Sequence, residues 1–242
     1  MIPKKLHYVW LGGAPIPQEY QRYIDGWRDM MPDWEIVRWD ETNFDIEGSC
    51  DYCRQAYQAK RWAFVSDYVR VKVLYEHGGI YLDTDEEMIR PLDKFAMHDA
   101  FFGMEAGKLI GGQVFGCERG HKLMKVLMDD YDNRAFVCRG NQDTTVIGNH
   151  IARVLMGVYP QFRPTDKLHE LESDVFVYPS EYFCPDMRGP VDGPNTYTIH
   201  HYAGTWLSSG QRLKMKFNDF IGQRNAKQLS RIKQWLKRRL NR

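Results

Sequence analysis

Two carboxylates, Asp83 and Asp85, stand two residues apart directly after the short apolar run 80–82. In an extended segment, side chains at positions i and i+2 point to the same side of the backbone. Carboxylate oxygens are hard ligands, so two of them on one side could hold a divalent cation against a diphosphate group. The alternative is a solvated turn, because Asp-x-Asp is short enough to occur by chance. The spacing indicates a metal-diphosphate site if the neighbouring residues support it.

A helix is expected directly before this pair, over residues 60–77. Gly78 and Gly79 would end that helix and allow a sharp reversal into the strand that carries the carboxylates. Asp67 and Arg70 lie three residues apart on one flank of the helix, near enough to pair with each other or to reach one ligand together. A purely structural salt bridge is the alternative. The helix is indicated by apolar residues at helical spacing, namely Phe64, Tyr68, Val71, Leu74 and Tyr75.

The stretch 63–85 resembles the core signature of glycosyltransferase family 32, sugar transferases with a "DXD" motif found in capsule and surface-polysaccharide pathways. It is also similar to the matching block of the large clostridial glucosylating toxins. A match at so many fixed positions is specific, unlike the tripeptide alone. The positions that carry it are Ala63, Ser66, Asp67, Arg70, Leu74, Tyr75, Gly78, Gly79, Ile80, Tyr81, Asp83 and Asp85.

The N-terminus carries the same resemblance. The β-rich run 6–11 is closed by two glycines, and the string IPK-x-x-HYVW-x-GG resembles the first strand of family 32. In that family an aromatic residue after the strand stacks on the nucleotide base. The resemblance implies this role for Trp10, with Val9 and Tyr81 also expected to contact the nucleotide. From residue chemistry alone, a core tryptophan in the first strand is equally consistent.

Two adjacent histidines, His200 and His201, lie in a third run near the C-terminus. An imidazole nitrogen is a good ligand for Mn²⁺ and a tolerable one for Mg²⁺. The pattern H-Y-x-G-x-W starting at His201 resembles the histidine motif of related retaining transferases, in which the histidine completes the metal shell and the tryptophan closes over the donor phosphate. The resemblance implies these roles for His201 and Trp206. His200 would point to the opposite face of a strand, and the assignment could be swapped.

A polar cluster at Asn141, Gln142 and Asp143 precedes the helical stretch 146–155. It partly resembles the N-D-Q-D segment of family 8 transferases, which implies that these three residues line the sugar pocket. The alternative is a helix N-cap, with Asp143 or Thr144 as the capping residue.

Strand and helix signals alternate along the chain. This alternation predicts an α/β fold with a mostly parallel central sheet flanked by helices, and ligands bind beyond the carboxyl ends of the strands in such sheets. The resemblance specifies it as a GT-A type nucleotide-sugar transferase fold, and we expect one catalytic domain over 1–210. The expected elements are strands at 6–11 and 35–39, helices at 17–31, 60–77 and 121–131, and short apolar runs at 100–104 and 113–116.

Composition suits one compact enzyme. The 242 residues are 43% hydrophobic and 14% aromatic, enough to bury a full core. No run reaches the roughly 20 apolar residues needed to span a bilayer, and charged residues interrupt any signal-peptide core. Five cysteines, an odd number, suit a reducing compartment. We therefore expect a cytoplasmic protein; Cys50-x-x-Cys53 has zinc-knuckle spacing, but no second convincing pair accompanies it.

Charge is distributed unevenly. Residues 211–242 contain eleven Lys and Arg and one acidic residue, Asp219, a local charge of +10, so with the whole chain at +1 the remainder carries −9. Apolar residues among these basic ones are typical of an interfacial helix drawn to anionic lipid. A basic helix packed on the domain and a nucleic-acid-binding segment are the alternatives. We expect peripheral contact with the inner face of the membrane, and no nucleic-acid partner.

Together these patterns predict a metal-dependent, retaining transferase that moves a sugar from a nucleotide-sugar donor, preferably a UDP-sugar, to a glycan or lipid-linked acceptor. Asp83, Asp85 and His201 would hold Mn²⁺ or Mg²⁺, which neutralises charge on the leaving nucleotide. Asp67 and Arg70 would orient the donor sugar or its phosphate. No second carboxylate nucleophile is evident near these motifs, which fits front-face attack by the acceptor hydroxyl.

Two other classes of protein are weighed against this one. Phosphohydrolases of the haloacid dehalogenase type also place Asp-x-Asp after a strand, but their motif usually continues to Thr or Val where this chain has Glu87. A non-catalytic nucleotide-sugar-binding protein is the other, and the intact Asp67, Arg70, Asp83 and Asp85 argue against it.

Overall fold

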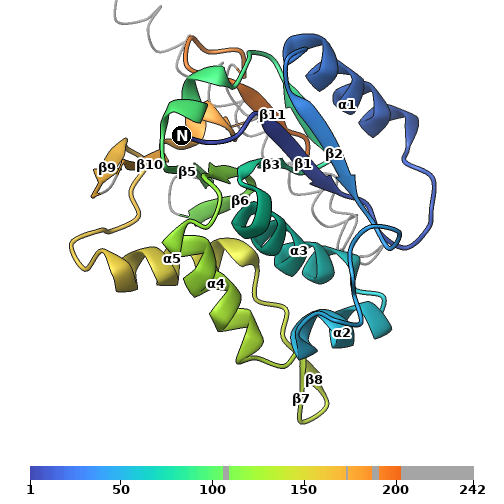
Figure 1. Cartoon of the computed structure of the whole chain (residues 1–242). Coiled ribbons are helices and arrows are strands. Elements are labelled where there is room, and N and C mark those ends of the chain that lie inside the picture. Colours follow the sequence, from blue (N-terminus) through green and yellow to red (C-terminus); the bar gives the residue numbers. More distant parts are fainter. Residues whose placement is uncertain (106–108, 173, 187–190, 203–242) are drawn as a thin grey trace, which may run out of the picture.

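The computed structural model describes residues 1–105, 109–172, 174–186 and 191–202. Its centre is a seven-stranded sheet with the order β2-β1-β3-β6-β5-β10-β9 (Figure 1). The strands are β1 (Lys5–Val9), β2 (Glu35–Trp39), β3 (Gly79–Leu82), β5 (Ala100–Glu105), β6 (Leu109–Cys117), β9 (His169–Leu171) and β10 (Val175–Tyr178). Only β6 and β9 pair antiparallel to their neighbours, and the other five run in one direction. The predicted fold class, α/β with a mostly parallel central sheet flanked by helices, is confirmed.

Helices cover both faces of this sheet and form two cores. The helices are α1 (Gln18–Met30), α2 (Asp51–Gln58), α3 (Trp62–His77), α4 (Lys122–Asp132) and α5 (Ile147–Val158), with short 3₁₀ turns η1 (Asp93–Met97) and η2 (Ser180–Tyr182). One core lies between the sheet and α2 to α5. The other lies between the sheet and α1 with η1, and α1 is on the opposite side of the sheet from α2 to α5 in Figure 1.

Two small sheets complete the structure. β4 (Glu86–Met88) pairs antiparallel with β11 (Thr198–His200), and β7 (Val137–Cys138) pairs with β8 (Asn141–Gln142) as a hairpin. The β4–β11 pair joins two segments that are far apart along the chain, and β4 follows directly after the Asp-x-Asp pair. Short strands of two or three residues carry too little periodicity for sequence patterns to detect.

The helix expected over 60–77 is observed as α3, starting at Trp62, and it is buried on most of its surface rather than on one face. Asp67 and Arg70 are among its buried residues, with 6% and 5% of their surfaces exposed. Charged side chains are rarely buried this deeply unless they are paired. The packing of α3 between the sheet and its neighbouring helices therefore requires partners for this acid and this base.

The turn from α3 into β3 depends on glycine. Gly78 and Gly79 have φ of 64° and 113°, in the region that side chains disfavour. A Cβ on Gly79 would lie 2.7 Å from the Lys5 carbonyl oxygen and 2.8 Å from His7 Nε2. The missing side chain thus lets β3 approach β1 closely enough to pair with it.

His7 stabilises the same turn through two hydrogen bonds. Its Nε2–H donates to the Gly78 carbonyl at 2.8 Å, so Nδ1 accepts from Trp39 Nε1 at 3.0 Å. Burial lowers the pKa of His7 to about 4, which keeps the imidazole neutral and both bonds in place at neutral pH.

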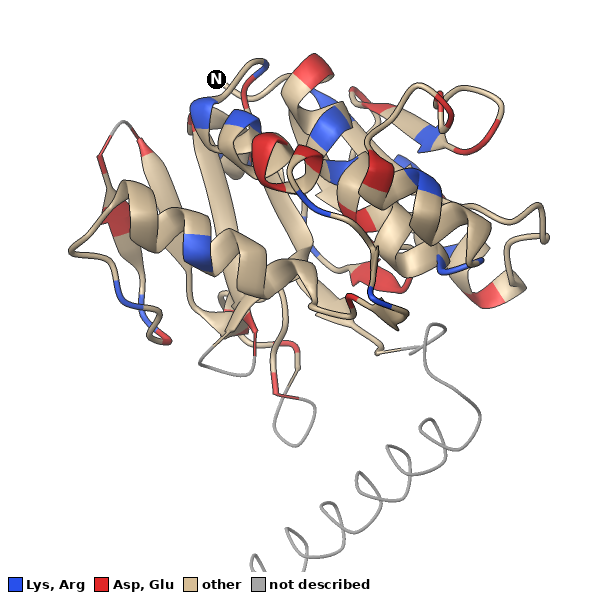
Figure 2. Ribbon diagram, turned by 90° about the horizontal axis from the view of Figure 1, so that it is seen from below, with Lys and Arg blue, Asp and Glu red and all other residues tan. Residues whose placement is uncertain are grey.

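Some expectations fall outside the described residues. Residues 203–242 include Trp206, the end of the expected 1–210 domain and the basic segment 211–242, so these stay predictions. Within the part of the chain that is described, no helix is both long and apolar enough to cross a bilayer. Lys and Arg are interspersed with Asp and Glu over the described helices (Figure 2), as on an ordinary solvated surface.

Gly148 tests the close packing of α5 on the sheet. A Cβ at this position would overlap the Ile110 carbonyl oxygen of β6, whereas nothing lies within 4 Å of a Cβ on Gly157 in the same helix. Gly148→Ala should lower the free energy of unfolding by about 1–3 kcal/mol, the usual cost of overpacking. Gly157→Ala, the matched control, should leave stability unchanged or raise it by up to about 1 kcal/mol. Urea denaturation followed by circular dichroism measures both, and equal stability of the two variants would contradict the close approach.

Candidate active site

Asp83 and Asp85 follow β3 at its carboxyl end, where a third potential ligand joins them. One ligand atom from each of Asp83, Asp85 and His200 lies within 4.8 Å of the others. His200 Nε2 is 3.4 Å from Asp85 Oδ2. Two carboxylates and one imidazole could hold a divalent cation.

The pairing of β11 with β4 brings His200 to this place. In the antiparallel register His200 lies opposite Glu86, and the next residue, His201, donates its backbone N–H to the Asp85 carbonyl at 3.1 Å. Side chains alternate along the strand, so only one of the two histidines can face the aspartates.

The geometry favours His200 over His201, the expected third ligand. Its Nε2 lies 2.8 Å from Glu87 Oε2, and its ring stacks on Tyr23 of α1, with centroids 4.9 Å apart and planes 5° from parallel. His201 therefore faces α1, and His200 is the histidine beside the two aspartates. The pairing of β11 with β4 decides which of the two side chains faces the aspartates, and this pairing cannot be read from the histidine motif.

Arg70 links the helix to the carboxylate pair. Its Nη2 is 3.2 Å from Asp67 Oδ1 and its Nη1 is 3.2 Å from Asp83 Oδ1. The guanidinium also donates to the Gly112 carbonyl at 2.6 Å and to the Ser66 hydroxyl at 2.9 Å. The structure thus pairs Asp67 with Arg70, which the sequence placed near enough to pair, and it adds a contact between Arg70 and Asp83. Protein groups occupy much of the guanidinium.

Tyr81 makes a second contact with Asp83. Its hydroxyl donates to Asp83 Oδ1 at 2.7 Å, and the Arg70 guanidinium lies 4.4 Å from the centre of its ring. Tyr81 is 1% exposed, so its contact is with the carboxylate rather than with an open site. Both holds on Asp83 are to the same oxygen, Oδ1.

The site concentrates negative charge. Burial raises the pKa of Asp67 to about 7 and also raises that of Asp83, while Arg70 opposes both shifts. Burial would lower the pKa of His200, but the carboxylates of Asp85 and Glu86 outweigh it and raise that pKa well above its ordinary value. This environment favours positive charge between the acidic groups.

Trp10 follows β1 at the same edge of the sheet. Its indole Nε1 donates to the Ala14 carbonyl at 2.6 Å. The indole also packs against the Tyr20 ring in a T-shaped arrangement, with the ring centroids 6.1 Å apart. The side chain is partly exposed, so one face could receive a planar ligand. Val9, by contrast, is packed in the core, and its contact with the nucleotide stays a prediction.

In the cluster at 141–143, the side chains of Gln142 and Asp143 contact other protein groups. Asn141 and Gln142 are exposed on β8, and Gln142 accepts from Arg61 Nε at 2.8 Å. Asp143 pairs with Arg134 and accepts the Thr145 N–H at 3.0 Å. These contacts do not support a sugar-pocket role for the three residues. The capping alternative also fails, because Val146 is the N-cap of α5 and no side chain caps it.

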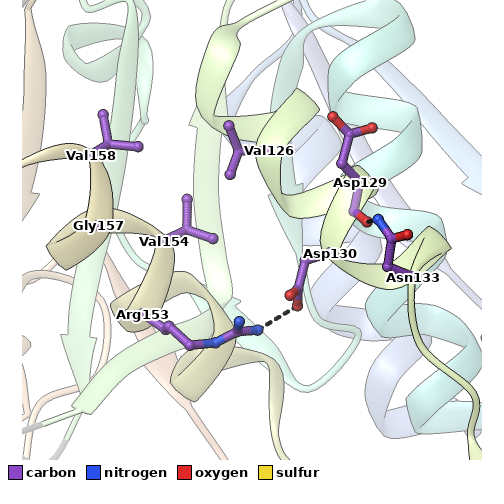
Figure 3. A pocket seen from close by; sticks show the side chains of 8 residues that line it. All are labelled: Val126, Asp129, Asp130, Asn133, Arg153, Val154, Gly157 and Val158. Carbon is purple, nitrogen blue, oxygen red and sulfur yellow. Dashed lines mark hydrogen bonds and ion pairs between the residues drawn. The ribbon is translucent and has the colours of Figure 1, made fainter.

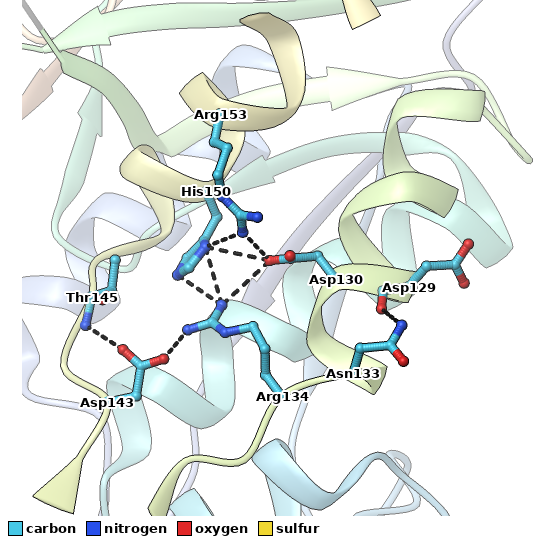
Figure 4. A network of polar contacts seen from close by, with 8 residues as sticks. All are labelled: Asp129, Asp130, Asn133, Arg134, Asp143, Thr145, His150 and Arg153. Atoms are coloured by element: carbon cyan, nitrogen blue, oxygen red, sulfur yellow. Dashed lines mark hydrogen bonds and ion pairs between the residues drawn. The ribbon is translucent and has the colours of Figure 1, made fainter. Parts of the chain in front are cut away.

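Asp143 belongs instead to a polar network between α4 and α5. Arg134 contacts Asp130 and His150 as well as Asp143, and Arg153 contacts Asp130 (Figure 4). The Asp130–Arg153 pair also borders a shallow groove between the two helices (Figure 3). This network ties the hairpin and the two helices together.

Sequence reasoning missed four groups close to the site. Glu86 is fully buried directly after the carboxylate pair, and its position inside an acidic run was a signal that could have been followed. Glu105 and Cys184 also approach His200, but nothing in the sequence marks them. The hydroxyl of Tyr52 is buried without a hydrogen-bond partner among the described residues, and its ring lies 5.0 Å from the Arg134 guanidinium.

A family model matches the part of the chain that contains the carboxylate pair. The model of the family described as "Glycosyltransferase sugar-binding region containing DXD motif" matches residues 17–102. That range runs from α1 into β5 and so contains α3, β3 and the Asp83–Asp85 pair.

Relatives with curated names agree with this match. The chain is 28% identical over 138 residues to inositol phosphoceramide mannosyltransferase 3 of Schizosaccharomyces pombe, covering 56% of this chain and 38% of the relative. It is 24% identical over 235 residues to the uncharacterized glycosyltransferase L373 of Acanthamoeba polyphaga mimivirus, covering 90% and 89%. It is 23% identical over 178 residues to subversion of eukaryotic traffic protein A of Legionella pneumophila, covering 60% and 27%. The match therefore spans less than half the length of the first and third of these relatives.

Solved structures with a similar arrangement include two glycosyltransferases. PaToxG glycosyltransferase has a TM-score of 0.49 and 15% identity, covering 66% of this chain and 70% of that one. A glycosyltransferase involved in glycosylation of the major capsid of PBCV-1 has a TM-score of 0.48 and 10% identity, covering 87% and 97%.

The matched region is the part of the chain that the site geometry singles out, and two relatives bear names of sugar transferases. The resemblance read from residues 63–85 is thereby confirmed, because residues 17–102 are similar to the sugar-binding region of glycosyltransferases with a DXD motif.

Proposed function

We propose that this glycosyltransferase is metal-dependent and retaining, and that it moves a sugar from a nucleotide-sugar donor, preferably a UDP-sugar, to a glycan or lipid-linked acceptor of surface-polysaccharide synthesis. The observation that carries the proposal is the group formed by Asp83, Asp85 and His200 at the carboxyl end of β3. Retention and the acceptor class follow from the resemblance to family 32.

The donor atoms of this group fit a divalent cation. Two carboxylates and one imidazole suit Mn²⁺, and they suit Mg²⁺ less well because of the nitrogen. The surrounding surplus of carboxylates, with Asp67 and Glu86 both buried nearby, supports a bound positive charge. A cation held here would neutralise the charge that develops on the leaving diphosphate.

The buried pair on α3 positions the site. Arg70 and Tyr81 both hold Asp83 Oδ1, which leaves the rest of that carboxylate to face the cation. Asp67 would accept hydrogen bonds from the hydroxyls of the donor sugar. Arg70 acts as a positioning residue, because protein groups already occupy its guanidinium.

Trp10 would receive the nucleotide base. Because β1 and β3 are parallel neighbours, Trp10 and Asp83 both lie beyond the carboxyl ends of adjacent strands, where ligands bind in such sheets. The bond to Ala14 and the contact with Tyr20 fix the indole in advance, which reduces the entropy lost on stacking.

Asp85→Asn tests the metal group. The substitution removes one ligand charge without changing the apolar core, so it should abolish sugar transfer and Mn²⁺-dependent UDP binding while the circular dichroism spectrum stays unchanged. Asp129→Asn, which changes an acid on α4 away from the group, is the control and should keep full activity. Turnover of Asp85→Asn within about tenfold of the parent at saturating Mn²⁺ would contradict the assignment.

The two histidines form a matched pair for a second test. His200→Ala should raise the Mn²⁺ concentration needed for half-maximal activity by about 10- to 100-fold or more, because it removes a direct ligand. His201→Ala should change that concentration little, since His201 faces Glu87 and Tyr23. A metal titration of activity gives the ranking, and the reverse order would restore the assignment to His201.

We further propose that the basic segment 211–242 docks the enzyme on the cytoplasmic leaflet of a membrane, where a lipid-linked acceptor would be presented. Each Lys or Arg near an anionic surface contributes about 1 kcal/mol, and the attraction fades as ionic strength rises. A full-length variant with the eleven Lys and Arg of this segment replaced by Gln should lose co-sedimentation with anionic vesicles and keep acceptor-independent donor hydrolysis. If the parent protein ignores anionic vesicles at low salt, the docking role is wrong.

A further inference from the structure

His200 stands between two groups of potential ligands. Its Nε2 lies 3.4 Å from Asp85 on the side of the proposed metal group. Its Nδ1 is buried, has no hydrogen-bond partner among the described residues, and lies 3.9 Å from Glu86 Oε1. The ring therefore has one nitrogen beside Asp85 and the other beside Glu86.

His200 also belongs to a second set of potential ligands. Ligand atoms of Glu105, at the end of β5, and Cys184, after η2, lie within 4.8 Å of each other and of His200. Cys184 is 3% exposed and is a free thiol, and its Sγ lies 2.7 Å from the Tyr202 hydroxyl. A thiolate, an imidazole and a carboxylate together are ligands that Zn²⁺ prefers, whereas Mn²⁺ and Mg²⁺ prefer oxygen.

Glu86 provides independent support for a cation at this place. It is 0% exposed, and neither of its carboxylate oxygens has a hydrogen-bond partner among the described residues. Its charged neighbour is His200, whose Nδ1 lies 3.9 Å from Glu86 Oε1, and burial raises the pKa of Glu86 to about 8. A cation bound beside His200 would favour the ionised form of this buried carboxyl group.

We propose that Glu105, Cys184 and His200 form a second cation site, for a thiophilic divalent cation such as Zn²⁺, and that filling it inhibits sugar transfer by withdrawing His200 from Asp83 and Asp85. On binding, the Cys184 thiol and the His200 imidazolium each release one proton to solvent, and the sulfur and the freed ring nitrogen become ligands; nothing is oxidised or reduced. A neutral imidazole has one nitrogen free to bind a metal, because the other carries the proton. The two donor sets therefore exclude each other.

Binding at the second site is independent of the proposed function, whereas inhibition rests on it. The binding test uses the full chain, freed of metal with a chelator and titrated with Co²⁺ and Zn²⁺. A thiolate ligand gives Co²⁺ a charge-transfer absorption in the near ultraviolet, and calorimetry gives the Zn²⁺ affinity. The parent should show the absorption, and Cys184→Ser should lose it and bind Zn²⁺ at least about 100-fold more weakly. Cys138→Ser removes the exposed thiol of β7 and should behave as the parent.

Unchanged Zn²⁺ affinity in Cys184→Ser, or loss of the absorption in Cys138→Ser instead, would overturn the site. If circular dichroism shows that Cys184→Ser is unfolded, Glu105→Gln replaces it as the test. That variant should bind Zn²⁺ at least about tenfold more weakly, and unchanged affinity would overturn the site as well.

Asp85→Asn separates the second site from the proposed function. It should keep the Co²⁺-thiolate absorption while losing transfer; if it keeps transfer instead, the proposed function fails and the second site stands. Loss of the absorption in Asp85→Asn would mean that the two groups are one site and would overturn the proposal. In the presence of Mn²⁺, added Zn²⁺ should inhibit the parent but not a folded Cys184→Ser, and equal inhibition of both would overturn the competition.

Discussion

The site depends on one buried positive charge, the guanidinium of Arg70, which lies between the carboxylates of Asp67 and Asp83. Moving three charged groups out of water is costly, and only their mutual attraction and further hydrogen bonds offset that cost. Removing one partner of such a pair leaves the others uncompensated, at a cost of about 3–5 kcal/mol. Arg70 thus joins helix α3 to the end of strand β3, and the orientation of the DXD carboxylates is part of the fold.

A second constraint is the edge of the sheet at which the parallel strands β1 and β3 end. Gly79 lets these strands approach, so that Trp10 and Asp83 follow neighbouring strands in the same direction. The β4–β11 pair then adds His200 from far along the chain. The candidate site is assembled from three segments, each of which offers one kind of group: an aromatic ring, a pair of carboxylates and an imidazole.

His200 is surrounded by acidic groups. Asp83, Asp85, Glu86 and Glu105 all lie in its electrostatic surroundings, and Cys184 adds a soft donor on one side. The oxygen-rich group suits a hard cation, and the sulfur-containing group suits a soft one. Because His200 belongs to both groups, the identity of the bound cation would decide whether the ring binds metal with Asp83 and Asp85 or with Glu105 and Cys184.

The resemblance to family 32 put Asp67 and Arg70 in one site with the DXD pair. Sequence patterns by themselves determined the α/β class, helix α3, the turn at Gly78–Gly79 and the proximity of Asp67 to Arg70. These features are local, because helical spacing, glycine conformations and i, i+2 or i, i+3 neighbours need no knowledge of distant residues. The tertiary structure decided the rest. Whether His200 or His201 faces the aspartates depends on the register between β11 and β4, and the direction of Asp143 depends on Arg134 of the segment after α4. The approach of Glu105 and Cys184 to His200 is likewise a contact between separate elements, which only packing of the whole chain determines.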